Sequence, residues 1–151
     1  MAISTDSAIE FFGTQDTLGT SSASVADNAF SIASDLSTWT NDDDAPMASV
    51  TGTFTCSVAP DVYTGLNLYL RLLNTVSTND SDVPDANFQH TFAGHFPLND
   101  VTSAQYVTID IALPNGKTSQ EYEFYIENKA GQTVSAGWDI YVTPKTIGPH
   151  A

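Results

Sequence analysis

The sequence has very few basic residues. Only 4 of its 151 residues are Lys or Arg, against 18 that are Asp or Glu, so the formal net charge is −14. A protein that binds nucleic acid neutralises several phosphates with such cations, and an anionic membrane surface attracts cations in the same way. The charge therefore excludes nucleic acid and membrane as partners. It favours free copies that repel one another, or docking onto a basic partner surface.

The chain also lacks a second cysteine and a long apolar run, and we expect no leader segment. Cys56 is alone, so no internal disulfide can form, and its place in the alternating stretch 50–58 favours a small buried residue. No basic segment followed by an apolar one opens the chain, and no apolar run has the length of a membrane span. We therefore expect synthesis in the cytoplasm, without a signal peptide or a transmembrane helix.

Motifs that carry catalysis or bind metals are missing too. The sequence contains no HExxH, CxxC or GxSxG and no glycine-rich phosphate loop. Two acidic loops, residues 42–44 and 80–85, offer the hard oxygens that calcium prefers, but neither has EF-hand spacing, and we interpret both as solvated charges. His90, His95 and His150 do not form a zinc motif. We therefore predict no enzyme activity, no cofactor and no metal.

What the sequence does have is repeated alternation of apolar and polar residues. It runs through residues 30–36, 47–58, 66–72, 107–113, 121–127 and 138–142, with a less regular stretch around 88–96. A period of two is typical of a strand with one buried face. Turn residues separate the stretches, among them Asn115-Gly116, because Asn-Gly readily adopts positive φ. Seven strands without a convincing helix predict an all-β antiparallel β-sandwich, jelly-roll or immunoglobulin-like.

The length of the chain fits one domain with two terminal extensions. We predict an N-terminal arm over residues 1–28, the β-sandwich over 29–144 and a short C-terminal tail over 145–151. The arm is polar except for an apolar island at Ile9-Glu10-Phe11-Phe12, where Ser4 or Thr5 could cap a short helix. The tail is not expected to continue a strand past its prolines.

The apolar residues of the arm need a surface to cover them. Burying Ile9, Phe11, Phe12 and Leu18 would contribute about 1.5–3 kcal/mol each, roughly 6–12 kcal/mol together. Ordering some ten residues of backbone costs about 1–2 kcal/mol each, so the two contributions nearly cancel. We expect the arm to order only when backbone hydrogen bonds are added, as an extra strand on a neighbour's sheet edge. Folding back onto its own domain is the main alternative. In the first case, deleting residues 1–20 leaves the β domain folded.

Three aromatic residues complete the predicted interface. Trp39 stands beside the acidic loop, and Tyr125 and Tyr141 alternate out of phase with the core residues of their strands. Tyrosine is favoured in protein interfaces, and exposed aromatics can stack on sugars. Ordinary cross-strand aromatic pairing is the alternative interpretation.

With this organisation, the chain resembles small virion structural proteins of tailed bacteriophages. The resemblance rests on the opening Met-Ala-Ile-Ser-Thr, the Ser/Thr/Asp-rich arm, the β-sandwich and the short tail with prolines. It also rests on the closing hairpin, Glu-Tyr-Glu-Phe-Tyr-Ile-Glu-Asn at 121–128 and Trp-Asp-Ile-Tyr-Val at 138–142. The chain is most similar to capsid decoration, or cement, proteins.

The resemblance implies a non-enzymatic protein that sits on the outer capsid surface and bridges neighbouring capsid subunits. Its partners would be the major capsid protein and copies of itself, as a homo-oligomer and often a trimer, after synthesis in the host cytoplasm. A tail-tube or tail-tip protein is a close variant. A carbohydrate-binding adhesin module is a different class, with Trp39, Tyr125 and Tyr141 as sugar platforms and an acidic loop as a calcium site.

Overall fold

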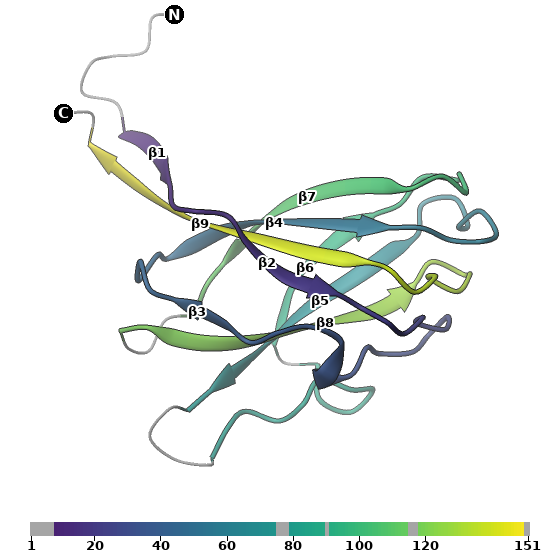
Figure 1. Cartoon of the computed structure of the whole chain (residues 1–151), viewed down its shortest axis with the longest axis horizontal. Coiled ribbons are helices and arrows are strands. Elements are labelled where there is room, and N and C mark those ends of the chain that lie inside the picture. Colours follow the sequence, from purple (N-terminus) through teal and green to yellow (C-terminus); the bar gives the residue numbers. More distant parts are fainter. Residues whose placement is uncertain (1–7, 75–78, 90, 115–117, 150–151) are drawn as a thin grey trace, which may run out of the picture.

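The computed structural model describes residues 8–74, 79–89, 91–114 and 118–149. These residues contain nine strands and one short 3-10 helix, joined by loops (Figure 1). The strands are β1 (Ala8–Phe12), β2 (Asp16–Thr20), β3 (Trp39–Asn41), β4 (Met47–Phe54), β5 (Gly65–Leu73), β6 (Phe92–Pro97), β7 (Gln105–Ala112), β8 (Gln120–Lys129) and β9 (Asp139–Pro149). The 3-10 helix covers Ala33–Asp35. No helix among the described residues has the length and apolar character needed to span a membrane.

The strands form two antiparallel sheets that pack together as a β-sandwich, which confirms the predicted fold class. One sheet has five strands in the order β1-β9-β4-β7, and β2 pairs with β9 along the same edge as β1. The other sheet has four strands in the order β3-β8-β5-β6. The two sheets hold nine strands, whereas alternation predicts seven. The short strands β1, β2 and β3 were not predicted, because they have too few residues to show a period of two.

The core lies between the sheets and follows the alternation of the sequence. Along β4 every second residue is buried, and β9 shows the same alternation over residues 139–144. In β8 the alternation holds over residues 120–124, after which residues 125–128 are all buried. The largest fully buried apolar side chains of the core include Phe54, Phe96, Trp138, Ile126 and Ile140. Cys56 is buried at 1% exposure, as its alternating context predicts.

The stretch 30–36 alternates in sequence but is not a strand along its whole length. Phe30 pairs with Glu127 at the edge of β8, and the Ser31 amide donates to the carbonyl of Ile126 at 2.8 Å. The chain then turns, because a carboxylate oxygen of Asp35 accepts the amide of Ile32 at 2.8 Å and closes the 3-10 helix. The strand prediction is therefore wrong beyond Ser31, and Ile32 is 61% exposed.

The two prolines of the C-terminal segment do not end its strand. β9 continues through Pro144 to Pro149, contrary to the prediction. Pro144 faces residues 13–15, the short connection between β1 and β2. This connection is not a strand, so no strand residue there needs a hydrogen bond from a backbone N–H at position 144. The carbonyl of Pro144 still accepts the amide of Gly13 at 2.8 Å. Residues 145–149 of the predicted tail are therefore strand, and residues 150–151 lie outside the described part of the chain. Pro144 lies where the missing N–H costs no ladder bond.

The described part of the N-terminal arm pairs with its own domain. β1 pairs with the end of β9 from Ala8↔Pro149 to Phe12↔Lys145, and β2 pairs with β9 near Val142. Ala8–Phe12 is thus a strand and not a helix, while residues 1–7 lie outside the described residues. The alternative of folding back is the one that the structure shows. Leu18 and Val25 belong to the core, so the sandwich takes in residues from within the predicted arm.

Candidate functional site

The feature that stands apart from the sandwich is a two-stranded ribbon made of β1 and the end of β9. Figure 1 shows the two strands leaving the body together. β4 begins at Met47, opposite Lys145, so β9 beyond Lys145 has β1 as its one described strand partner. An isolated pair of strands is only marginally stable in water. We call Ala8–Phe12 with residues 145–149 the ribbon.

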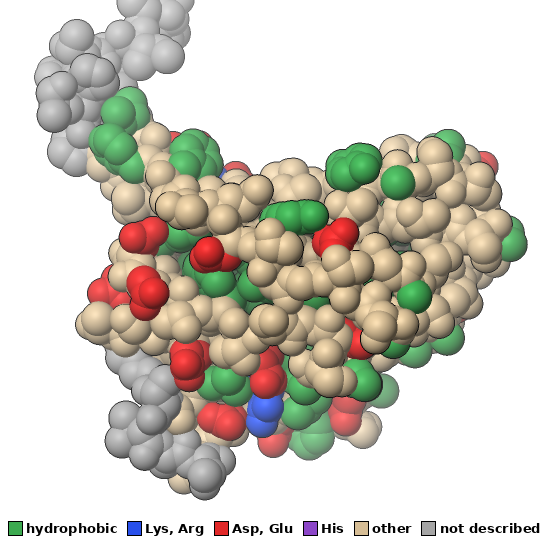
Figure 2. Space-filling model, in the orientation of Figure 1, with side chains coloured by type: hydrophobic (Ala, Val, Ile, Leu, Met, Phe, Trp, Pro, Cys, Tyr) green, Lys and Arg blue, Asp and Glu red, His purple; other side chains and the backbone are tan. Residues whose placement is uncertain are grey.

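The ribbon exposes large apolar side chains. Phe11 is 45% exposed, Phe12 is 58% exposed and Ile147 is 54% exposed. The pairing Glu10↔Ile147 and Phe12↔Lys145 places Phe12 and Ile147 on one face of the ribbon, and Phe11 lies on the other. Figure 2 shows hydrophobic atoms gathered over this projection. The ribbon thus presents apolar side chains on both of its faces, which makes it the candidate contact surface.

An ammonium group fixes the base of the ribbon to the sandwich. Lys145 Nζ lies 2.6 Å from a carboxylate oxygen of Asp110 on β7 and 3.2 Å from one of Glu10 on β1. The side chain of Lys145 is only 2% exposed. The hydrogen bond to Asp110 raises the pKa of Lys145, and the bonds from Lys145 and Ser49 lower the pKa of Asp110. One lysine thereby joins β1, β9 and β7 across the start of β4.

A hollow of about 330 Å³ lies between the ribbon and the β3–β4 loop. Its lining combines aromatic rings, prolines and carboxylates: Phe11, Phe12, Asp43, Asp44, Pro46 and Pro144. Asp44 also accepts the amide of Ser119 at 2.8 Å, so this loop is attached to the turn before β8. The ribbon therefore overhangs a partly acidic recess at one end of the sandwich.

We expect replacement of Lys145 by glutamine to loosen the ribbon without unfolding the sandwich. The substitution removes two ion pairs whose carboxylates are half exposed, at 49% for Glu10 and 54% for Asp110. Exposed pairs contribute little, so amide exchange at Phe11 and Thr146 should become about 2- to 10-fold faster. The matched control is Lys129→Gln, which lies in the other sheet. Equal exchange at the ribbon in both variants would contradict the role of Lys145.

The predicted interface residues fall into two groups. Ile9, Phe11 and Phe12 lie on the ribbon, and Tyr141 is half-buried on the outer face of the five-stranded sheet beside Thr51. The other three are buried: Leu18 at 2%, Trp39 at 3% and Tyr125 at 0% exposure. The chain's own residues cover these three side chains, so the structure does not present them on its surface.

Trp39 and Leu18 are buried where β2 and β3 meet. The indole of Trp39 packs against Tyr122 and Phe124 and donates from Nε1 to a carboxylate oxygen of Asp16 at 2.8 Å. The carbonyl of Leu18 accepts the amide of Ser37 at 2.7 Å. These contacts close one flank of the sandwich.

Tyr125 points away from the core, as its phase predicts, yet it is covered by the chain's own loops. Its hydroxyl donates to Glu123 at 2.7 Å, and Glu123 pairs with Arg71 at 2.9 Å. Arg71 in turn donates to the carbonyl of Ser81 at 2.7 Å, which holds the loop after β5 over this face. Burial and the bond to Glu123 raise the pKa of Tyr125. No sugar platform forms there.

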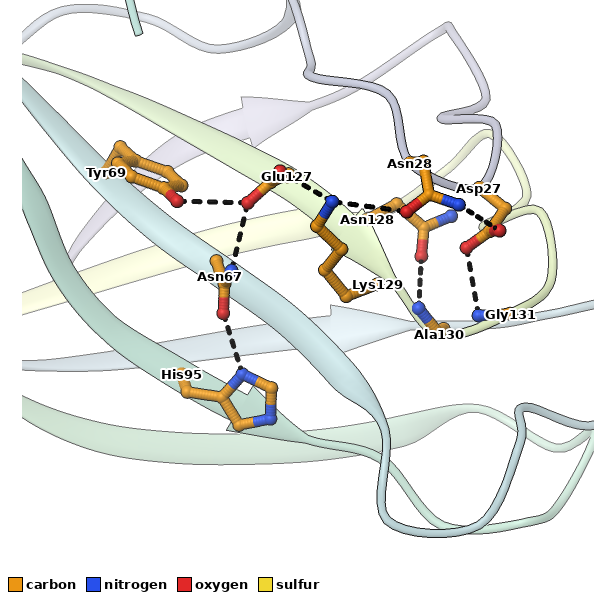
Figure 3. A network of polar contacts seen from close by, with 10 residues as sticks. All are labelled: Asp27, Asn28, Asn67, Tyr69, His95, Glu127, Asn128, Lys129, Ala130 and Gly131. Atoms are coloured by element: carbon orange, nitrogen blue, oxygen red, sulfur yellow. Dashed lines mark hydrogen bonds and ion pairs between the residues drawn. The ribbon is translucent and has the colours of Figure 1, made fainter. Parts of the chain in front are cut away.

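A second buried network lies farther along the same outer face (Figure 3). Glu127 is 3% exposed and accepts hydrogen bonds from Tyr69 and Asn67, both at 2.9 Å, while Lys129 lies 2.9 Å from its other oxygen. Asn67 also contacts His95 Nδ1 at 2.9 Å. With both oxygens occupied by protein donors, Glu127 anchors the fold and is not placed to transfer a proton to a substrate.

The charge states in this network follow from its contacts. Burial opposes the ionised form of Glu127, but the bonds from Lys129, Asn67 and Tyr69 outweigh it and lower its pKa. Burial and the bond to Glu127 raise the pKa of Tyr69 to about 12. Asn28 accepts from Lys129 at 3.1 Å and Asp27 accepts the amide of Gly131 at 3.0 Å, so the network ties the segment before Phe30 to the last hairpin.

Acid should destabilise the protein in a defined pH range because of these carboxyls. The pKa of Glu127 lies below its ordinary value of 4.5 and that of Asp110 below 3.8. The folded state binds fewer protons, so the extra stability is present above these ordinary values and is lost as the pH falls through the lowered ones. Urea unfolding between pH 7 and pH 3 measures the loss. Glu127→Gln should lose less stability with acid; an unchanged pH dependence would contradict this role.

The structure leaves the acidic loops and the histidines without a metal-binding arrangement in its described part. No group of three His, Cys, Asp or Glu side chains there could hold a metal ion. Asp80 accepts the amide of Asn74 at 2.7 Å, and Asp85 accepts the amide of Asn87 at 2.6 Å. These carboxylates cap turns. His90 and His150 lie outside the described residues.

Sequence reasoning did not identify Glu10, Asp110, Lys145 or Ile147 as parts of a site. Lys145 is 135 residues from Glu10 and 35 residues from Asp110 along the chain, so their ion pairs depend on strand pairings that alternation does not predict. One signal was present: Lys145 is the one basic residue in the last segment of a chain with only four. All three described cations, Arg71, Lys129 and Lys145, are ion-paired.

Comparison with known proteins adds no relative to this description. No protein-family model matches the chain, and no curated protein matches it.

Proposed function

We propose that this chain is a non-enzymatic virion structural protein that decorates a phage capsid and bridges neighbouring capsid subunits through the ribbon. The observation that carries the proposal is the ribbon itself, with Phe11, Phe12 and Ile147 about half exposed on a two-stranded projection. Burying three such side chains contributes several kcal/mol, about 1.5–3 kcal/mol for each if burial is complete. Covering the ribbon with a partner would therefore bury apolar surface that the free chain leaves in water.

The charge supports an assembly role for a protein at high local concentration. A net charge of −14 keeps free copies apart, and the described cations are all engaged in ion pairs. The proposed partners are the major capsid protein and further copies of this chain, as a trimer on the outer surface of the shell. Several ribbons in one oligomer would multiply the affinity of each weak contact.

Stabilisation would follow from selective binding. A protein that binds the expanded shell but not its precursor stabilises the expanded state by mass action. The test is co-sedimentation of the purified chain with expanded and with precursor capsids of the same phage. We expect binding to expanded capsids alone, at hundreds of copies per particle. Absence of binding to both would refute capsid decoration.

A tail-tube or tail-tip role uses the same ribbon on a different partner. The copy number in purified particles separates these assignments, because a tail tip holds a few copies and a shell holds hundreds. The carbohydrate-binding alternative has less support, because it requires exposed aromatic side chains for stacking on sugars. Trp39 and Tyr125 are buried, and Tyr141 is half-buried.

A further inference from the structure

The edges of the sandwich differ in how well the protein covers them. At one flank β6 and β7 lie against each other: a Cβ atom on Gly94 would come within 2.7 Å of Ile109 Cδ1. At the other flank β2 and β3 are joined through the Asp16–Trp39 hydrogen bond. β1 projects beyond the body together with the end of β9, and no described strand lies beside its outer edge (Figure 1). Exposed edges of this kind readily pair with another strand.

The backbone groups that face this outer edge follow from the pairing. The amide of Gly13 donates to the carbonyl of Pro144, so Gly13 points toward β9. Alternation along the strand then directs the backbone of Ile9 and Phe11 toward β9 as well, in the register that β1 shows. The N–H and C=O groups of Ala8, Glu10 and Phe12 point outward. These six groups have no hydrogen-bond partner among the residues described.

We propose that the outer edge of β1 accepts an extended segment of a different protein, paired as an additional strand, with a lysine or arginine opposite Glu10. This proposal rests on the assembly function proposed above and specifies how the partner is recognised. Main-chain hydrogen bonds to Ala8, Glu10 and Phe12 supply affinity, and alternate side chains supply specificity. The residue opposite Glu10 meets its carboxylate, which is 49% exposed.

The charge at the centre of β1 argues against a second copy of this chain as the occupant. If the β1 strands of two copies pair antiparallel, only one register pairs all three outward-facing residues. That register places Ala8 opposite Phe12 and Glu10 opposite Glu10 of the other copy. Like charges directly opposite each other destabilise a strand pair. Asp110 and Glu10 both form ion pairs with Lys145, so each copy would contribute two carboxylates and only one ammonium group to the contact. A basic partner strand removes this excess.

Phe12 defines the apolar part of the recognised segment. It shares a face with Glu10 and is 58% exposed, so the partner residue opposite it should be apolar. The segment therefore reads as an alternating strand in which a basic residue and an apolar residue are two apart.

Two synthetic peptides test the proposal on the full chain: acetyl-Val-Thr-Lys-Thr-Val amide, with Lys opposite Glu10 and Val opposite Phe12, and the same peptide with Glu in place of Lys. Binding is followed by amide chemical shifts and hydrogen exchange. We expect the amides of Glu10 and Phe12 to exchange rapidly in the free protein and to be protected by the Lys peptide. The Glu peptide should bind about 2- to 30-fold more weakly, as cross-strand attraction changes to repulsion.

Two variants separate the backbone contribution from the charge. Glu10→Pro removes an outward N–H and leaves those that face β9, so it should weaken binding of the Lys peptide at least about 10-fold. Glu10→Gln keeps the edge and should bind both peptides with nearly equal affinity. Slow Phe11 exchange in both variants shows that the ribbon is still formed. Equal binding by Glu10→Pro and wild type, or no binding of either peptide, overturns the proposal.

Capsid co-sedimentation distinguishes this inference from the function on which it rests. If wild type and Glu10→Pro bind expanded capsids equally, strand addition is wrong and decoration stands. If the wild-type protein does not bind capsids, decoration is wrong, and the peptide experiment still decides whether the edge accepts a basic strand.

Discussion

Replacing Phe11 and Phe12 with serine is expected to weaken capsid binding at least about 30-fold, because truncating one buried aromatic anchor at an interface typically costs about 2 kcal/mol or more. The free protein should melt within about 2 °C of wild type. The two rings are 45% and 58% exposed in the free chain, so the substitutions remove little of its own packing. Binding is measured by co-sedimentation and stability by thermal unfolding.

The chain offers a matched control for this pair. Val62 and Tyr63 are also adjacent, apolar and exposed, at 60% and 99%, but they lie in the loop before β5. Serine at both positions should leave capsid binding unchanged. If the Phe11 and Phe12 variant binds as well as the control, the ribbon is not the contact surface. If it melts much lower as a free protein, the rings belong to the chain's own core.

Two truncations should differ sharply in stability. Deleting residues 1–12 removes β1, whose Phe11 and Phe12 side chains are about half exposed, and should leave the sandwich folded. Deleting residues 1–20 also removes β2 and Leu18, which is 2% exposed in the core. Losing a buried leucine side chain costs about 2–5 kcal/mol, so melting should fall by about 4–20 °C relative to the shorter truncation.

The control for the truncations is Leu18→Ala in the full chain, which isolates the packing contribution from the loss of the β2–β9 hydrogen bonds. It should account for a large part of the difference. Equal melting of the two truncated proteins would mean that Leu18 contributes nothing to the core. That result would restore the sequence-based expectation that residues 1–20 are dispensable for folding.

Much of the fold could be predicted from residues whose alternation is strong. Val50, Phe124 and Ile140 each lie in long alternating stretches, and all three are buried between the sheets. The short strands could not be predicted this way. Asp16–Thr20 has one buried residue, and its pairing with β9 depends on contacts more than a hundred residues away.

Burial of the outer face of the four-stranded sheet is the main point where alternation misleads. Tyr125 has the phase of a solvent-facing residue, yet Phe30 and Phe92 pack against its neighbour Tyr69, with ring centroids 5.4 and 5.7 Å apart. Alternation tells which face a side chain is on but not what covers that face. The apolar island at Phe11 and Phe12 was visible in the sequence, because two adjacent phenylalanines in a polar segment need a partner surface.

Hydrogen exchange of the full chain, free and bound to expanded capsids, tests the role of the ribbon most directly. We predict rapid exchange of the outward amides of Glu10 and Phe12 in the free protein and strong protection of residues 8–13 and 145–149 in the complex. The outer face of β4, at Ser49 and Thr51, should be unchanged. Protection confined to β4 and β7, with the ribbon as exposed in the complex as in the free protein, would contradict the ribbon as the binding surface.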